Sequence, residues 1–204
     1  MSASRPRVVL VGPMGAGKTT VAGLLGSRWS LDVRDTDLDV EAAEGRSISD
    51  IFVDDGEEHF RRLERAAVVA ALADHPGVLA LGGGAVLDPE TRADLVGHRV
   101  VFLSVGLSDA VKRVGLGITR PLLMGNMRAR IKALLDERLP VYREVAALTV
   151  DTDGRPPEEV ADEVARLVEH AERADQSDSS DSEQSDSSGE SDSSGESDQE
   201  GIDA

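Results

Sequence analysis

The segment Gly12–Thr19 (GPMGAGKT) contains the residues whose spacing most directly indicates chemistry. It fits G-x-x-x-x-G-K-[ST], the pattern of a phosphate-binding loop. Its glycines allow backbone N–H groups to turn inward around an anion, and the start of the following helix adds unpaired N–H donors. Lys18 can reach the β- and γ-phosphates and the Thr19 hydroxyl can ligate Mg²⁺, so the sequence predicts a nucleoside triphosphate site. Its phosphate contacts are expected from Gly15, Ala16, Gly17, Lys18, Thr19 and Thr20.

Two acidic residues, Asp35 and Asp37, follow a short stretch near Asp32–Arg34 that is expected to be the second strand. One carboxylate can steady Mg²⁺ through its waters, and the other can accept a substrate hydroxyl and orient or deprotonate it. In isolation, a D-x-D pattern is better explained by a helix N-cap followed by a solvated acid. Opposite a phosphate-binding loop, we interpret it as part of an acceptor site, with Asp35 supporting the metal.

Three consecutive glycines, Gly82, Gly83 and Gly84, follow the apolar run Val78–Leu81. A turn alone does not require three of them. Without side chains, they allow a ligand to approach the backbone closely and to accept hydrogen bonds from its N–H groups. We therefore expect this run to contact the second substrate.

Arg61, Arg120 and Arg138 are candidates for binding an anion, because a guanidinium pairs bidentately with a carboxylate or a phosphate. Taken alone, Arg61 and Arg138 also suit solvated positions on helices. Arg120 lies in the loop-like segment Gly115–Asn126. A mobile loop with an arginine can close over a triphosphate and neutralise the charge that develops in phosphoryl transfer.

Apolar runs alternate with stretches of helical spacing along the chain, which is typical of an α/β fold with a parallel sheet covered on both faces. Strands are expected at Arg7–Val11, Asp32–Arg34, Val78–Leu81, Arg99–Ser104 and Leu148–Asp151. Helices are expected at Lys18–Trp29, Ser47–Phe52, Glu57–Asp74, Pro89–Val96, Ser108–Val114 (capped by Ser108), Met127–Glu137 and Pro157–Glu172. Because ligands bind at the carboxyl ends of parallel strands, the three motifs that follow strands are expected to converge at one edge of the sheet.

The charge of the 204-residue chain is unevenly distributed. Of the net charge of −17, the segment Ala171–Ala204 contributes −11, with 12 acidic residues and one basic residue. Residues 1–173 are expected to form one domain, and the acidic, serine-rich tail 174–204 is expected to be disordered. The acidic composition argues against nucleic-acid binding. With no signal peptide, membrane span or extended apolar surface stretch evident, we expect a cytoplasmic monomer.

Together these motifs resemble those of the shikimate kinase family. The matching segments are Gly12–Thr19, Asp35–Asp37, Asp50–Phe52, Gly56-Glu57, Phe60-Arg61, Leu81–Ala85, Arg120–Leu123 and Arg138–Tyr142. The resemblance implies a three-layer sandwich like that of P-loop nucleoside monophosphate kinases, with a five-stranded parallel sheet in the order 2-3-1-4-5 and a mobile lid. It also implies transfer of the γ-phosphoryl group of ATP to the 3-hydroxyl of shikimate, in the pathway to chorismate and the aromatic amino acids.

On the nucleotide side, the resemblance implies that Lys18 and Thr19 hold phosphate and Mg²⁺, with support for the metal from Asp35. Arg120 corresponds to the lid arginine that contacts phosphates, and it is implied to be catalytic together with Lys18. The segment before it, Gly115–Thr119, is more apolar than is usual in the family. The residues that match the region enclosing adenine are Arg113 and Arg155.

On the acceptor side, the resemblance implies that Asp37 binds shikimate hydroxyls and is the candidate base. Arg61 and Arg138 correspond to the residues that bind the shikimate carboxylate, with the backbone of Gly82–Gly84 nearby. Two alternatives stay open. One is a related gluconate or nucleotide kinase, and the other is a non-catalytic ATP-binding switch that acts through the tail.

Overall fold

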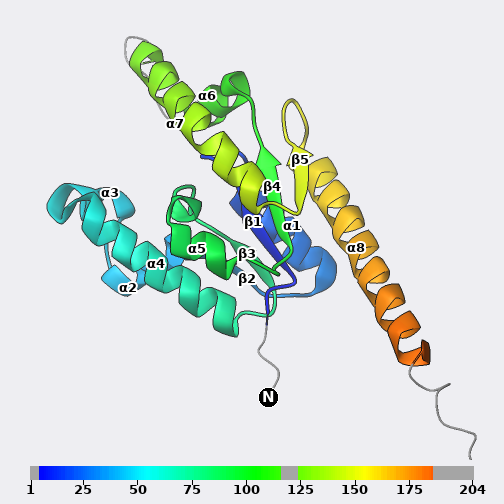
Figure 1. The fold of residues 1–204 in the computed structure, drawn as a ribbon. Coiled ribbons are helices and arrows are strands. Elements are labelled where there is room, and N and C mark those ends of the chain that lie inside the picture. Colours follow the sequence, from blue (N-terminus) through cyan, green and yellow to red (C-terminus); the bar gives the residue numbers. More distant parts are fainter. Residues whose placement is uncertain (1–4, 116–123, 186–204) are drawn as a thin grey trace, which may run out of the picture. The chain divides into compact units, whose positions relative to one another are not determined.

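The computed structural model describes residues 5–115 and 124–185, with side chains described for 5–114 and 127–177. The chain divides into two compact units, Met1–Val168 and Glu169–Ala204. The first unit contains a parallel sheet of β1 (Val8–Val11), β2 (Val33–Asp35), β3 (Val78–Ala80), β4 (Val100–Ser104) and β5 (Leu148–Asp151). The strand order is β2-β3-β1-β4-β5 (Figure 1), which confirms the expected order.

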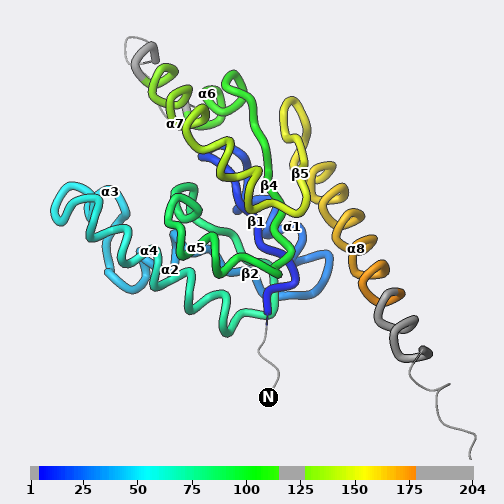
Figure 2. Tube along the Cα trace, in the orientation of Figure 1, coloured from blue at the N-terminus to red at the C-terminus, as the bar shows by residue number. Residues whose placement is uncertain are grey.

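The helices follow the strands in alternation, as Figure 2 traces along the chain. They are α1 (Lys18–Trp29), α2 (Thr36–Glu44), α3 (Ile48–Asp54), α4 (Gly56–Asp74), the 3₁₀ turn η1 (Ala85–Leu87), α5 (Pro89–Asp94), α6 (Leu107–Gly115), α7 (Met124–Val145) and α8 (Pro157–Ser185). Ser47 is the N-cap of α3 and accepts a hydrogen bond from the Asp50 amide, and Asp88 is the N-cap of α5 and accepts one from the Glu90 amide. Among the described helices, none is both long enough and apolar enough to cross a membrane.

Strand side chains alternate between the two faces of the sheet, so each face builds its own core. On one face, Val8, Leu10, Val101 and Leu103 pack with residues of α1, α6, α7 and α8. On the other, Val9, Val11, Leu79 and Phe102 pack with residues of α4, η1 and α7. All four residues of β1 are buried, as expected for a central strand that is covered on both sides.

Several helix boundaries differ from the sequence predictions. Helix α2 is not among the predicted helices, because the acceptor-site interpretation of Asp35 was preferred to that of a helix N-cap. Helix α6 begins at Leu107, so Ser108 lies in its first turn and is not its N-cap. Helix α7 begins at Met124, inside the segment that was expected to be a loop, and continues past Glu137.

Helix α7 contains Pro140 in its interior. Proline there removes a backbone hydrogen bond and costs about 3 kcal/mol, which is why the sequence favours an earlier end. The turn around the proline is held by packing: Tyr142 is fully buried and stacks on Phe102 of β4 at 5.1 Å between ring centroids, and Leu139 packs on the same core. Burial of these side chains offsets the local penalty.

In the second unit, α8 continues to Ser185, although the sequence predicts its end near Glu172. Ala174 and Gln176 favour a helix, and this local propensity opposes the disorder expected from the composition of the tail. Residues 186–204 lie outside the described part of the chain, so the expected disorder there and the division at residue 173 stay predictions.

Candidate active site

The loop between β1 and α1 has the geometry of an anion site. Gly15 and Gly17 adopt φ angles of 79° and 88°, in the left-handed region that glycine tolerates best. Lys18 begins α1 and folds back over the loop, where its ammonium donates to the carbonyl oxygens of Gly12 at 2.7 Å and Pro13 at 3.2 Å. Burial lowers the pKa of Lys18, and the carboxylates of Asp37 and Asp35 act in the opposite direction.

A cleft of about 580 Å³ opens beside this loop. Arg113 of α6 spans it at one point, donating to the Gly15 carbonyl and to the Thr152 hydroxyl at 3.0 Å each. The cleft therefore has the phosphate-binding loop on one side and the segment after β5 on the other. Its lining residues are Met14, Gly15, Ala16, Gly17, Lys18, Thr19, Thr20, Val21, Arg113, Thr152, Arg155, Pro157 and Val160.

A second cleft of about 260 Å³ contains the residues expected to contact the acceptor, apart from Gly82. The first and second clefts share Met14 and Lys18, so the Lys18 side chain reaches both. The residues lining the second cleft are Met14, Lys18, Asp37, Ile48, Phe52, Phe60, Arg61, Glu64, Gly83, Gly84, Leu134 and Arg138.

Asp35 and Asp37 have different environments. The Asp35 carboxylate accepts hydrogen bonds from the Asp37 amide at 3.0 Å and from the Thr19 hydroxyl at 2.8 Å, so it is a helix N-cap as well as a neighbour of the phosphate-binding loop. Asp37 faces the second cleft. Burial raises the pKa of Asp37 to about 6, helped by the charges of Asp35 and Glu64 and opposed by that of Lys18.

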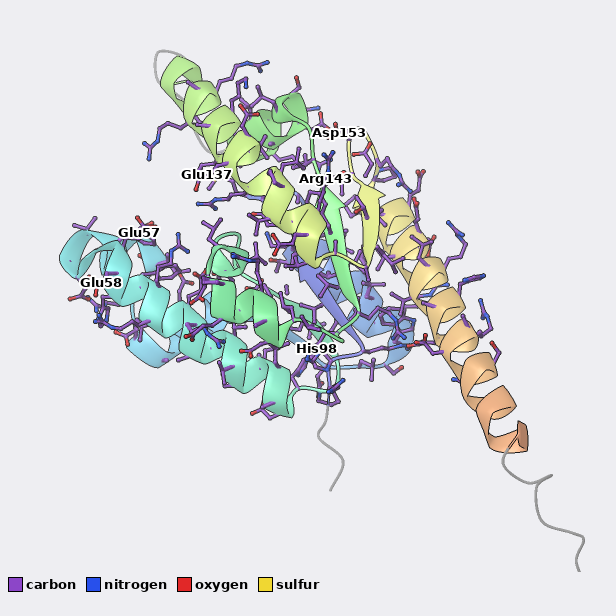
Figure 3. All side chains as sticks on the ribbon, viewed as in Figure 1. Glu57, Glu58, His98, Glu137, Arg143 and Asp153 are labelled. Carbon is purple, nitrogen blue, oxygen red and sulfur yellow. The ribbon has the colours of Figure 1, made fainter. Side chains whose placement is uncertain are left out.

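Arg61 and Arg138 approach the second cleft from different helices. Arg61 of α4 donates to Glu64 at 2.7 Å and to Glu57 at 2.9 Å, and Glu57 is labelled near the start of that helix in Figure 3. Arg138 of α7 donates to the Gly83 carbonyl at 3.2 Å, and its Nε is buried without a hydrogen-bond partner among the described residues. A buried donor of this kind has unused capacity for an anion.

The glycine run is a point of close approach. A Cβ on Gly82 would lie 2.3 Å from Asp37 Oδ1, and one on Gly84 would lie 2.1 Å from Arg61 Nη1. The Gly82 amide donates to the buried Thr36 hydroxyl at 3.0 Å, which joins this run to the start of α2. The run therefore leaves room for the site side chains that surround it.

The residues 14–169 match the protein-family model described as shikimate kinase. The chain belongs to the shikimate kinase family. It is 60% identical over 163 residues to the shikimate kinase of Thermobifida fusca (strain YX), covering 80% of this chain and 95% of that protein. It is 63% identical over 163 residues to that of Salinispora arenicola (strain CNS-205), covering 80% and 98%.

A solved structure of shikimate kinase from Acinetobacter baumannii in complex with shikimate is similar to this chain, with a TM-score of 0.76 and 33% identity. The similarity covers 83% of this chain and 96% of that one. The shared shikimate kinase fold therefore extends over most of the chain.

Arg120 is the one expected site residue that lies outside the described part of the chain. Four further residues lie at the site and were not predicted from the sequence: Glu64, Thr36, Thr152 and Tyr142. Glu64 is only 4% exposed, and burial raises its pKa while Arg61 and Arg138 lower it. The clue to Glu64 in the sequence is its position three residues after Arg61, which places both side chains on the same face of the helix.

Proposed function

We propose that this chain transfers the γ-phosphoryl group of ATP to the 3-hydroxyl of shikimate, producing shikimate 3-phosphate and ADP. The observation that carries this proposal is that Lys18 lines both clefts, so that a triphosphate in one faces an acceptor in the other. Phosphoryl transfer depends mainly on such positioning and on neutralisation of charge. Family membership supports shikimate as the acceptor.

On the acceptor side, Arg61 and Arg138 bind the carboxylate of shikimate. Both line the second cleft, and a guanidinium matches a carboxylate in a bidentate pair. Asp37 accepts a hydrogen bond from the reacting hydroxyl and orients it or removes its proton. Because Gly82–Gly84 have no side chains, the shikimate ring can approach their backbone closely.

On the nucleotide side, Gly15–Thr20 bind the phosphate chain, and Lys18 stabilises the charge on the transferred group. Arg113 and Arg155 also line the first cleft and enclose the adenine. Arg120 acts as a catalytic cation over the phosphates. This role rests on the sequence motif alone, since the residue is outside the described part of the chain.

Mg²⁺ fits the oxygen donors at the start of α1. The described residues contain no cluster of three or more side chains suited to holding a metal. Mg²⁺ does not need one, because it commonly takes one or two protein oxygens and completes its shell with water and substrate phosphates. We propose that Thr19 ligates it directly and Asp35 through water. When bound, Mg²⁺ neutralises charge on the β- and γ-phosphate oxygens.

A coupled ADP-release assay on the full chain tests the proposal, with shikimate, gluconate and nucleoside monophosphates as acceptors. We expect saturable turnover with shikimate alone. Preferential turnover of gluconate or a nucleotide would support the related kinase. ATP binding without turnover on any acceptor would support the non-catalytic switch.

We also propose that the chain works as a cytoplasmic monomer. The large exposed apolar side chains of the described residues include Leu38, Val53 and Val96, which belong to α2, α3 and the segment after α5. Exposed single apolar residues of this kind do not require a partner. Sedimentation of the full chain at micromolar concentration is expected to give one species of monomer mass, and a concentration-dependent dimer would contradict this.

The rate is expected to fall at acidic pH because of Asp37. With a pKa raised to about 6, its carboxyl group is ionised above that pH and protonated below it. Only the ionised form accepts the hydroxyl proton, so kcat/KM for shikimate should fall about tenfold per pH unit below about pH 6. The measurement is a pH profile at saturating ATP, which removes titration of the free nucleotide. A flat profile between pH 7 and pH 5 would rule out the ionised Asp37 as the acceptor of the proton.

A methyl group on Gly84 is expected to raise KM for shikimate. In Gly84→Ala, the new Cβ would displace the Arg61 guanidinium, which lies 2.1 Å from that position. Because the end of the Arg61 side chain can move, the fold should survive while its contact with the shikimate carboxylate weakens. We expect kcat/KM for shikimate to fall about tenfold. Gly23→Ala is the matched control, since a Cβ there meets nothing within 4 Å. Equal kinetics for the two variants would show that Arg61 does not need its present position.

A further inference from the structure

The segment after β5 forms one wall of the first cleft, yet only part of it faces the nucleotide. Thr152 and Arg155 line the cleft, whereas Asp153 and Gly154 between them do not. Asp153 is labelled in the loop between β5 and α8 in Figure 3. The side chain of Asp153 and the backbone of Gly154 therefore serve contacts other than the nucleotide.

Those contacts form a reciprocal pair, which we call the acidic clasp: Asp109 with the Gly154 amide, and Asp153 with the Gly106 amide. Asp109 Oδ2 accepts from the Gly154 amide at 2.7 Å, and Asp153 Oδ1 accepts from the Gly106 amide at 2.7 Å. Asp109 of α6 thus binds the backbone of the loop after β5, and Asp153 of that loop binds the backbone just before α6. The backbone of Gly106 is approached closely, since a Cβ there would lie 2.4 Å from Asp153 Oδ2.

The clasp also reaches Arg113. Asp109 lies four residues before Arg113 on α6, and its Oδ2 accepts from Arg113 Nη2 at 3.4 Å. The Nη1 of Arg113 donates to the Gly15 carbonyl and to Thr152. The Asp109 carboxylate therefore binds both the Arg113 guanidinium and the loop after β5. A partly exposed ion pair, such as Asp109–Arg113 with side chains 28% and 29% exposed, contributes little stability by itself, so its effect is expected on geometry.

We propose that Asp109 is a positioning residue for the base half of the nucleotide. Through the Gly154 amide and Arg113, it keeps the α6 wall and the β5–α8 wall of the first cleft at a fixed separation, so that both sides contact the base at once. The phosphate half is held by the loop before α1, to which Asp109 connects only indirectly, through Arg113 and its hydrogen bond to the Gly15 carbonyl. The inference rests on the proposed nucleotide site, and not on the identity of the acceptor.

The test compares ADP with inorganic pyrophosphate, which has the phosphate groups and lacks the base. Calorimetric titration of Asp109→Ala is expected to show ADP binding weakened about tenfold, because hydrogen bonds to a charged group are lost, and pyrophosphate binding unchanged within about twofold. Asp109→Asn keeps an oxygen for the Gly154 amide, and its loss of ADP affinity should be smaller. Asp153→Ala, which breaks the other half of the clasp, should weaken ADP binding without affecting pyrophosphate.

Asp136→Ala is the matched control. Asp136 forms an ion pair with Lys132 on α7 at a spacing of four residues, as Asp109 does with Arg113 on α6. It does not line the first cleft and is not part of the acidic clasp. It should leave both affinities unchanged. Equal weakening of ADP and pyrophosphate in Asp109→Ala would overturn the proposal, because it would mean general distortion of the site. Unchanged ADP affinity would also overturn it. Neither result depends on turnover with shikimate, so failure here is distinguishable from failure of the proposed reaction.

Discussion

Replacing Asp37 with asparagine is expected to lower kcat about 1,000-fold, within the range that a positioned acid or base contributes. The amide is nearly the same size as the carboxylate, but it cannot accept the hydroxyl proton. Asp37 lines the second cleft and not the first, so the dissociation constant for ATP should change by less than about threefold. The two quantities are measured by coupled ADP release and by calorimetric titration.

Asp39→Asn is the control for this variant. Asp39 lies two residues later in the first turn of α2, and its carboxylate pairs with Arg34 at 2.6 Å instead of facing the acceptor cleft. Near-normal turnover is expected for the control. If Asp37→Asn kept more than a tenth of the normal kcat, the acceptor hydroxyl would have to be aligned by another group.

Replacing Arg138 with alanine is expected to lower kcat/KM for shikimate about 100-fold or more. The change removes one of the two guanidinium groups that line the second cleft, and loss of a charge-assisted pair costs on the order of 3 kcal/mol. It also removes one donor to the Gly83 carbonyl, which keeps its hydrogen bond from the Tyr142 hydroxyl. Because Arg138 does not line the first cleft, ATP affinity should be retained. Steady-state kinetics with shikimate as the varied substrate measures the effect.

Two further variants separate charge from geometry at this position. Arg138→Lys keeps a cation but loses the planar fork, so it should recover part of the activity and not all of it. Arg130→Ala removes an exposed arginine earlier on α7 and should have no effect. A KM for shikimate that stays unchanged in Arg138→Ala would remove this residue from the carboxylate site.

The site residues that could be predicted from the sequence are those that lie in short motifs. The phosphate-binding loop, the D-x-D pair and the glycine run each follow a strand, and the rule that ligands bind at strand ends brought them together. The structure places Lys18, Asp37 and Gly84 around one cleft, as expected. For Asp35, the structure shows the N-cap of α2 and a hydrogen bond from the Thr19 hydroxyl, and its support of the metal stays a prediction.

The parts that were not predictable depend on contacts between distant segments. In the sequence, Glu64 resembles an exposed acid on a helix surface. In the structure, it lies on the face of α4 that is directed toward Arg138 and the glycine run. Tyr142 anchors the same run by donating to the Gly83 carbonyl, and burial raises its pKa to about 12, so it remains a neutral donor. Asp109 gives no signal at all in the sequence, because its partner Gly154 is 45 positions away.

The most direct test of the account is a crystal structure of the full chain with shikimate, ADP and Mg²⁺. We expect the carboxylate of shikimate at hydrogen-bond distance, roughly 3 Å, from the guanidinium groups of both Arg61 and Arg138, with a ring hydroxyl on Asp37 and directed toward the phosphates. Shikimate bound with its carboxylate away from both arginines, or in a cavity that Lys18 does not reach, would contradict the shared-site arrangement.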